Sequence, residues 1–293
     1  MEPTFMTDGS ERMRYRDPAI PLYIVQGDLV SLRNMVFLAH WHEDIELMLC
    51  LKGYQTYNVN GQAIRVDEGC AIFVNARQLH SCQTTDGTDC QYRCICFRPE
   101  LLCANAAIRD RFVLPILTNP QLPWLMLRPE NPDHAPLLNI LKALPPEAGH
   151  EMEALGLLQI FWQGLHGLSG GTASGGESTH VQTLRRMLTF IRTHYQERIT
   201  LQDIAEAGGV CRSKGCQIFR ECLQTTPNEY LNSFRLEMSM ELLTGTALSI
   251  TAIAQECGFS SGSYFSELFA KCKGCSPTAY RTSNVVWNEI QSH

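Results

Sequence analysis

No apolar run in this sequence is long enough to cross a membrane. A transmembrane helix needs about 20 consecutive apolar residues, and polar or charged side chains interrupt every apolar stretch of the 293-residue chain before that length. The stretch from Met1 to Asp17 is polar and charged, which excludes the apolar core of a secretory signal peptide. We therefore expect a cytoplasmic protein without a membrane partner.

A strong excess of basic side chains is also missing. The formal net charge is -6, and residues 1–178 carry 13 Lys and Arg against 20 Asp and Glu. Residues 179–293 are far less acidic, with 11 Lys and Arg against 10 Asp and Glu. A protein that binds nucleic acid through charge alone carries a large basic excess, so that class is excluded. Site-specific contact with few phosphates remains open for the C-terminal part.

A disulfide framework is not expected, although cysteine is abundant. The chain has 13 cysteines, an odd number, and no export signal, which together favour reduced thiols. Cys94 and Cys96 alternate as residues of one strand would. Cys272 and Cys275 have metal or redox spacing, but no second pair lies at zinc-finger distance. We interpret most thiols as small, partly buried side chains, and a thiol sensor or bound zinc are the alternatives.

The stretch Ser169–Ser178 is rich in glycine and serine and marks a domain boundary. Such a composition offers no side chains for a core, which predicts a flexible linker. The chain is long enough for a core on each side of it. The expected order is a flexible arm (1–18), a β-barrel (19–103), connecting and dimerising helices (104–168), the linker (169–179), an all-α domain (180–285) and a tail (286–293).

Short β-rich runs separated by turn residues fill the first part of the chain. Asn60-Gly61 is the strongest hairpin signal among the turns and predicts a type I′ turn. Many short strands at regular spacing predict a sandwich or a barrel. The expected strands are Ile45–Leu51, Gln55–Val59, Ala63–Val66, Cys70–Val74 and Tyr92–Phe97.

Four side chains in this strand-rich part have the chemistry of a metal site. His40, His42 and Glu46 are separated by even numbers of residues, so on one extended strand they would project to the same face. His80 follows a turn and could return to the same pocket from another strand. Three imidazoles and a carboxylate suit zinc, iron, nickel or manganese. An organic-effector pocket and purely structural hydrogen bonding are the alternatives.

A helix–turn–helix pattern occurs twice in the C-terminal part. Residues 253–269 predict a short helix, a corner at Gly258 and a second helix with a small, polar outer face, which suits a DNA major groove. The same pattern begins 49 residues earlier, and after the corner the offset becomes 50. A repeat at such a period is not chance. The apolar face expected to be buried in the second unit comprises Tyr264, Phe265, Leu268 and Phe269.

From about residue 181 to 281 the chain resembles the DNA-binding domain of the AraC/XylS transcription regulators. The residues that carry the resemblance are Ile253-Ala254, Cys257-Gly258-Phe259-Ser260, Ser263-Tyr264-Phe265, Phe269, Lys271, Gly274, Ser276-Pro277 and Tyr280-Arg281, with Pro227, Tyr230-Leu231, Arg235-Leu236 and Leu242-Leu243 in the earlier copy. The resemblance implies two helix–turn–helix units joined by one long helix at about 227–244. It also implies double-stranded DNA, RNA polymerase and a small-molecule effector as partners, and a homodimer through helices after the barrel.

The family pattern assigns the residues that face DNA. In the first recognition helix they are Arg212, Ser213, Lys214, Cys216 and Gln217, and in the second they are Gly262, Ser263, Ser266 and Glu267. Arg212 and Lys214 are expected near the DNA backbone, and Gln217 can bond adenine bidentately. Gly215 stands where the second unit has Phe265, which predicts a softer first unit because glycine weakens a helix and fills no core.

The strand-rich part resembles the cupin motifs in the spacing of His40, His42, Glu46 and His80. It departs from the second motif at Asn75, Arg77 and Thr84, where proline, glycine and asparagine are usual. The leading interpretation is an effector-responsive activator, not an enzyme, with no certain cofactor and a divalent transition metal as a possibility for the barrel. The alternatives are a metal-dependent cupin sensor or enzyme fused to a DNA-binding domain, and a redox regulator using Cys211, Cys216 or Cys222.

Overall fold

The structure is a computed structural model that describes residues 6, 8–28, 38–83, 90–168 and 179–282. The chain folds into two units, which divide between Gln182 and Thr183. The first is rich in strands and is called the sheet domain below, and the second is called the helical domain. This organisation confirms the predicted fold class. In the described part of the chain, no helix combines the length and hydropathy that a membrane crossing needs.

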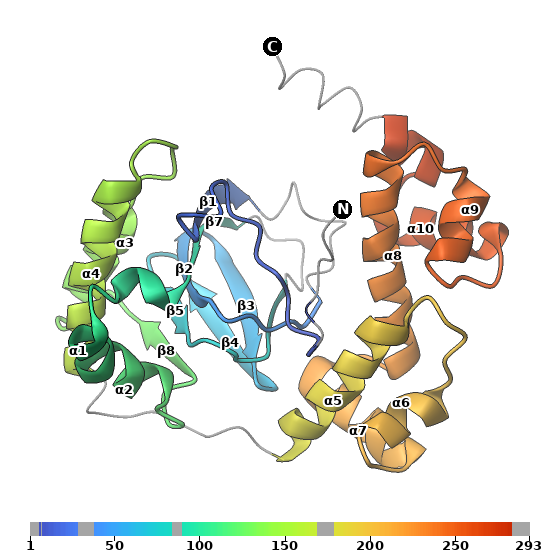
Figure 1. Ribbon diagram of the computed structural model, residues 1–293, viewed down its shortest axis with the longest axis horizontal. Coiled ribbons are helices and arrows are strands. Elements are labelled where there is room, and N and C mark those ends of the chain that lie inside the picture. Colours follow the sequence, from blue (N-terminus) through green and yellow to red (C-terminus); the bar gives the residue numbers. More distant parts are fainter. Residues whose placement is uncertain (1–5, 7, 29–37, 84–89, 169–178, 283–293) are drawn as a thin grey trace. The chain divides into compact units, whose positions relative to one another are not determined.

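Among the described residues, two antiparallel sheets form the sheet domain (Figure 1). The strand orders are β1-β7-β2-β5-β8 and β4-β3-β6. The strands are β1 (Leu22–Asp28), β2 (Ile45–Lys52), β3 (Tyr54–Val59), β4 (Gln62–Asp67), β5 (Ala71–Val74), β6 (His80–Gln83), β7 (Gln91–Phe97) and β8 (Trp124–Leu127). The turn between β3 and β4 has φ of 53° at Asn60 and 84° at Gly61, as the predicted type I′ turn requires.

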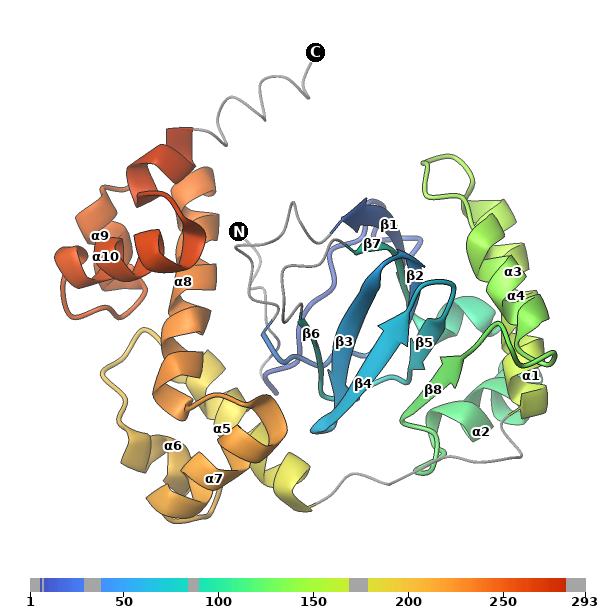
Figure 2. The same ribbon diagram turned by 180° about the vertical axis from the view of Figure 1, so that it is seen from behind.

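Helices cover one face of the larger sheet. Figures 1 and 2 both show α3 and α4 on the side of β2 and β5 that faces away from β3 and β4. The helical segments are a 3-10 turn (Pro99–Leu102), α1 (Ala106–Ile108), a π-helical turn (Arg109–Val113), α2 (Leu114–Leu117), α3 (Ala135–Ala143) and α4 (Glu151–Leu168).

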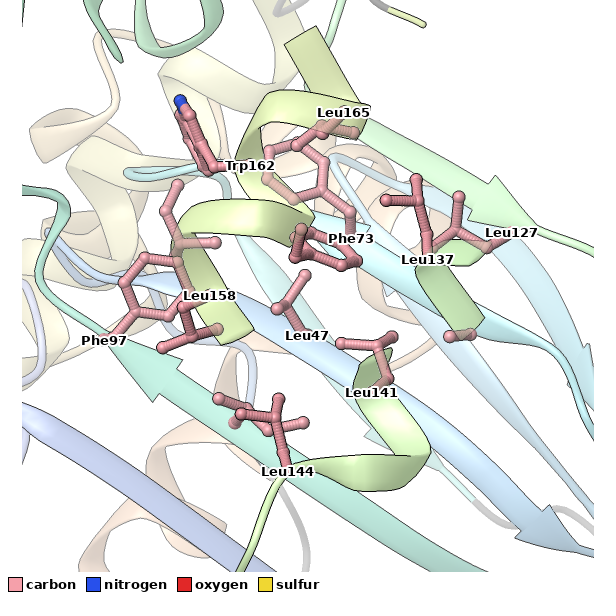
Figure 3. Close-up of a cluster of buried hydrophobic side chains, with 14 of the residues drawn as sticks. Leu47, Phe73, Phe97, Leu127, Leu137, Leu141, Leu144, Leu158, Trp162 and Leu165 are labelled. Carbon is pink, nitrogen blue, oxygen red and sulfur yellow. The ribbon is translucent and has the colours of Figure 1, made fainter. Parts of the chain in front are cut away.

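The core of the sheet domain lies between this sheet face and α4. Figure 3 shows Phe73 and Phe97 of the sheet directed toward α4, where Trp162 meets both rings edge-on at centroid distances of 6.2 and 6.4 Å. The Trp162 indole N–H donates to the Phe112 carbonyl at 2.9 Å, so its only polar atom is satisfied. Burying one large apolar side chain stabilises the fold by about 1.5–3 kcal/mol. This packing fixes the sheet whose opposite face carries the candidate site.

The helical domain contains two helix–turn–helix units arranged on the long helix α8. Its helices are α5 (Thr179–His194), α6 (Leu201–Ala207), α7 (Arg212–Leu223), α8 (Pro227–Gly245), α9 (Ile250–Glu256) and α10 (Gly262–Lys273). Sequence capping signals set several boundaries, because side-chain oxygens satisfy the first free N–H groups of a helix. Thr200 and Asp203 form a reciprocal capping box at α6, and Ser261 caps α10 by accepting from the Tyr264 N–H.

Two expectations differ from the structure. The N-terminal arm lies on the sheet domain from Asp8 onward: the Glu11 N–H donates to the Trp41 carbonyl at 2.8 Å, and the Tyr15 hydroxyl bonds the Asp44 carboxylate. Tyr264 is 43% exposed and is not on the buried face of α10, although Phe265 and Phe269 are. Residues 169–178 of the linker and the tail at 286–293 lie outside the described residues, as does Thr84.

Candidate functional site

His40, His42, Glu46 and His80 converge, but not by the route that the sequence suggested. His40 and His80 form a two-way backbone pair, with each N–H donating to the other carbonyl at 2.8 Å. The chain then bends at residues 43–44 before β2 begins at Ile45, so His40, His42 and Glu46 do not share one extended strand. The ring centroid of His80 lies 4.3 Å from the ring centroid of His40 and 4.9 Å from that of His42.

Glu46 is the centre of this cluster, which we call the imidazole site (His40, His42, Glu46 and His80). Its Oε2 lies 3.2 Å from Nε2 of His80 and 3.5 Å from Nε2 of His42. Its Oε1 accepts a hydrogen bond from the Tyr57 hydroxyl on β3. Glu46, His42, His80 and Tyr57 are buried, so these contacts have little competition from water.

The hydrogen bonds of two histidines fix which ring nitrogen faces Glu46. Nδ1 of His42 lies 3.1 Å from the Asp44 carbonyl, and Nδ1 of His80 lies 2.9 Å from the Gln78 carbonyl. A carbonyl only accepts, so we assign the proton of each neutral ring to Nδ1. Nε2 then directs a lone pair at the carboxylate, and within the described part of the chain Nε2 of His42 makes no hydrogen bond. A proton or a metal cation is needed between these groups.

The electrostatics of the site follow from burial and the shared carboxylate. Burial raises the pKa of Glu46, but His80 and His42 outweigh it, and the pKa ends well below its usual range. Burial lowers the pKa of His42, but the close contact with the Glu46 carboxylate and its negative charge outweigh burial and raise that pKa overall. Burial and the neighbouring His80 lower the pKa of His40 to about 4, so that ring is neutral at neutral pH.

The donor set fits a divalent transition metal ion. One potential ligand atom from each of the four residues lies within 4.8 Å of the others. Two ligand atoms on a tetrahedral zinc ion with bonds of about 2.0–2.1 Å are separated by roughly 3.3–3.4 Å, and the two Nε2–Oε2 distances bracket that value. The Nδ1–carbonyl bonds are the outer contacts that orient histidine ligands in metal sites. The residues present therefore fit such an ion.

The departures from the cupin motif have visible roles. Arg77, which replaces the usual glycine, has a φ of 63°, so the turn keeps the left-handed conformation that favours glycine. Its N–H donates to the His42 carbonyl at 2.8 Å and so ties the two histidine segments together. Asn75 is buried and its Nδ2 donates to the carbonyls of Ile116 and Leu122 at 2.8 and 3.0 Å. The turn before His80 is thus anchored without the motif residues.

Sequence reasoning missed three groups near Glu46. Tyr57 bonds it from β3, and Cys96 and Cys94 approach it from β7, which pairs with β2 so that Glu46 is opposite Cys96. Alternation placed Cys94 and Cys96 on one face, but nothing local indicates which strand lies beside β2. Trp41, which lies between His40 and His42 in the sequence, is buried.

The proposed DNA-facing side chains of both recognition helices are accessible. Five of the nine are exposed: Arg212, Ser213, Gln217, Ser263 and Glu267. The other four, Lys214, Cys216, Gly262 and Ser266, are partly exposed. The Gln217 amide donates to Glu221 at 2.6 Å along the exposed side of α7. The glycine corners before the two helices, Gly209 and Gly258, have φ of 72° and 76°, as the repeat predicts.

Gly215 does not leave a gap in the first unit. A Cβ at this position would lie 3.3 Å from the Ala205 Cβ and 3.5 Å from the Met187 sulfur. Glycine therefore lets α7 approach α6 closely, and Met187 of α5 occupies the space that a large side chain would need. The predicted loss of core contact at Gly215 is wrong, because a neighbouring helix supplies the contact.

Two family models match the chain. The model described as an AraC-like ligand binding domain matches residues 29–159, and the model described as a helix-turn-helix domain matches residues 204–283. The HTH-type transcriptional regulator YdeC of Bacillus subtilis, which is uncharacterized, is 29% identical over 94% of this chain and 96% of its own. The melibiose operon regulatory protein of Escherichia coli K12 is 26% identical over 95% of each chain.

A solved structure is similar over nearly the whole length. ToxT from Vibrio cholerae strain SCE256, crystallised with an unsaturated fatty acid bound, aligns over 92% of this chain and 97% of its own. The sequence identity is 16% and the TM-score is 0.47.

Proposed function

Because this chain belongs to the AraC family of transcription regulators, we propose that it is an activator whose sheet domain responds to a divalent transition metal ion. The protein is a DNA-binding regulator with an N-terminal ligand-binding domain and a C-terminal helix–turn–helix domain. The metal proposal rests on one observation: two buried imidazoles direct Nε2 at one carboxylate oxygen. We propose a sensing role and no catalysis, with the cytoplasm as location and RNA polymerase as the partner in activation.

Metal analysis of the full-length protein tests this proposal. We expect about one zinc, nickel, iron or manganese ion per wild-type chain and none in His80→Ala. The variant removes one metal ligand and one of the two imidazoles that contact the Glu46 carboxylate. Added metal should change wild-type binding to DNA selected in vitro, whereas the metal-free variant should bind that DNA like metal-free wild type. Equal metal content in both proteins would contradict the proposal. Metal-free wild-type protein that retains an organic molecule would favour the organic-effector alternative.

We propose that Gln217 reads a base and that Lys214 contacts phosphate. Gln217→Ala should weaken binding to the selected DNA by about 1–3 kcal/mol and relax one adenine position, because a bidentate pair is lost. Lys214→Ala is the matched control on the same helix and should weaken binding to all sequences by a similar factor. Binding-site selection with each variant distinguishes the two results. Unchanged sequence preference in Gln217→Ala would remove this residue from the reading face.

We further propose that the exposed face of α4 forms a homodimer contact with a second copy of the chain. Met152 is 81% exposed and Ile160 is 60% exposed, although both are large apolar residues on a regular helix. Gly156 lies one helical turn from each, and among the residues that the structure describes no neighbour comes within 4 Å of a Cβ there, so a partner helix can approach closely. A symmetric pair of such faces gives an isologous contact.

Replacing both apolar residues should convert the dimer to a monomer. Met152→Glu with Ile160→Glu places two like charges in each half of the contact, and desolvating them is unfavourable. We expect the mass measured by light scattering to fall from twice the chain mass to the chain mass at micromolar concentration. Leu248→Glu, which adds the same charge at an apolar residue with 40% exposure in the helical domain, should remain dimeric. A dimer that survives the double substitution would place the contact elsewhere.

A redox role has one observation in its favour. Cys211 is exposed at the start of α7, and hydrogen bonds from the Ser213 hydroxyl and from backbone N–H groups lower the pKa of its thiol. Cys222 differs, because burial raises the pKa of its thiol. If Cys211 is a sensor, peroxide should weaken DNA binding by wild type and not by Cys211→Ser. A gel-shift assay with and without reductant decides between a sensor and an inert thiol.

A further inference from the structure

The face of the larger sheet that is turned away from the hydrophobic core is rich in sulfur. On β2 and β7 alternate residues point to opposite faces, and the core receives Leu47, Leu49, Ile95 and Phe97. The residues between them, on the other face, are Glu46, Met48, Cys94 and Cys96. On the smaller sheet, the Cys82 thiol donates a hydrogen bond to the side-chain oxygen of Gln55 at 2.8 Å. The face of the larger sheet that carries the imidazole site therefore also carries thiol groups that could bind a metal ion.

Cys96 lies against the same carboxylate oxygen as His42 and His80, and Cys94 lies beside Cys96. Their sulfur atoms are 3.7 Å apart, and the Cys96 sulfur is 3.5 Å from Oε2 of Glu46. Oε2 is also the atom that lies 3.2 Å from Nε2 of His80. The ligand atoms of Glu46, Cys94 and Cys96 all lie within 4.8 Å of one another. We call these three residues the sulfur site, and it shares Glu46 with the imidazole site.

The separations match those around a tetrahedral ion. Two thiolates bound to zinc at about 2.3 Å are roughly 3.8 Å apart, and the observed distance between the two sulfurs is 3.7 Å. A thiolate and a carboxylate oxygen on one zinc ion are about 3.5 Å apart, which is the observed distance between Cys96 and Glu46. Little movement of either side chain is needed to bind an ion.

Ordinary packing explains only part of this arrangement. Cysteine is a small, apolar-like side chain and is often buried without a function. Cys50 is such a case, since it is fully buried at the other end of β2, 3.7 Å from the Cys90 sulfur. Cys94 and Cys96 differ because they adjoin a buried carboxylate and, through it, two imidazoles that need a cation. Cys50 therefore serves as the matched control for them.

We propose that Cys94 and Cys96 are ligands of the metal ion held by the sheet domain, which therefore takes Zn2+ and similar thiophilic ions in preference to Mn2+. The inference rests on the proposed function and adds to it the class of ion. Imidazole and thiolate donors together favour zinc and its tetrahedral substitutes, whereas manganese and magnesium prefer oxygen donors. Two thiolates also add negative charge that offsets a dication, whereas the imidazole site alone supplies the single carboxylate of Glu46.

Cobalt titration of the reduced full-length protein under inert gas tests this assignment. Co2+ replaces Zn2+ in tetrahedral sites, and bound thiolate gives a charge-transfer band in the near ultraviolet. We expect that band in wild type and in Cys50→Ser, and its loss in Cys94→Ser with Cys96→Ser. Zn2+ affinity in the double variant should fall by more than the roughly 10–100-fold that loss of an outer-shell contact gives. Mn2+ affinity should change far less.

The outcomes separate this inference from the function on which it rests. Wild-type protein that binds Co2+ without the charge-transfer band would contradict the proposal that Cys94 and Cys96 are ligands. Metal binding at the imidazole site would then still be supported. A band that persists in the double variant would contradict the sulfur ligands as well. Wild-type protein that binds neither Co2+ nor Zn2+ would overturn both proposals together. X-ray absorption of the zinc-loaded wild type requires no variant, and a sulfur shell at about 2.3 Å is the expected result.

Discussion

Replacing Gly258 by alanine should strongly destabilise the helical domain and leave the stability of the sheet domain unchanged. Gly258 has a φ of 76°, and a Cβ there would lie 2.3 Å from the Tyr195 carbonyl oxygen and 2.9 Å from the Arg235 guanidinium. That guanidinium donates to the carbonyls of Tyr195 and Glu197 at 2.8 Å each. The methyl group would therefore displace backbone as well as breaking two charge-assisted hydrogen bonds. We expect a loss of about 4 kcal/mol or more in the free energy of unfolding.

Gly209 provides the matched control because it occupies the same corner of the first unit. Its φ is 72°, but no neighbouring atom of the described residues lies within 4 Å of a Cβ at that position. Gly209→Ala should cost only the left-handed strain, about 1–2 kcal/mol. Thermal unfolding followed by circular dichroism should show a decrease in melting temperature of at least about 15 °C for Gly258→Ala and clearly less for Gly209→Ala. Equal decreases would mean that the close packing at Gly258 is unimportant.

Removing the Glu46 carboxylate should have the largest effect on metal binding. In Glu46→Ala both Nε2 atoms lose their shared anion, so we expect no stoichiometric zinc in the purified protein. Tyr57→Phe keeps all four proposed imidazole-site donors and removes only the hydroxyl that bonds Oε1. Loss of such an outer hydrogen bond typically weakens a metal site by about 10–100-fold. Competition with a chelator of known affinity measures both effects.

The Tyr57→Phe variant also distinguishes a metal site from a structural hydrogen-bond network. In a network without metal, Tyr57→Phe would leave a buried carboxylate oxygen unpaired and lower the free energy of unfolding by about 1–3 kcal/mol. Added zinc would then not restore any of that stability. In a metal site zinc should stabilise the variant, because an ion that binds only the folded protein shifts the folding equilibrium. Zinc-dependent melting of Tyr57→Phe decides between the two.

Local signals predicted most of the elements of the fold. Asn60-Gly61 predicted the turn between β3 and β4, because a type I′ turn depends on two adjacent residues. The internal repeat predicted the glycine corner of the first unit, at Gly209, from that of the second, at Gly258. Tyr264 was wrongly predicted to be buried. Periodicity shows which residues share a helix face, but the width of the face that a neighbouring helix covers depends on packing.

The candidate site was predictable only in part. Even spacing and the cupin resemblance brought His40, His42, Glu46 and His80 together as a hypothesis, although the chain bends between His42 and Glu46. Tyr57 and Cys96 reach Glu46 through pairing of strands that are distant in sequence, and register between such strands has no local signal. The same limit applies to Gly215, whose missing side chain is replaced by Met187 from another helix.

The shared helix α8 has a consequence for the DNA that this protein selects. Both recognition helices belong to one unit, in which Arg235 of α8 joins the segment before α6 to the corner at Gly258. If each recognition helix contacts DNA, the two helices enter the major groove at a fixed spacing, and we expect their half-sites to lie about one turn, roughly 10 base pairs, apart. Inserting half a turn of DNA between the half-sites would rotate one of them to the far side of the duplex. The recognition helix that contacts it could then no longer reach it.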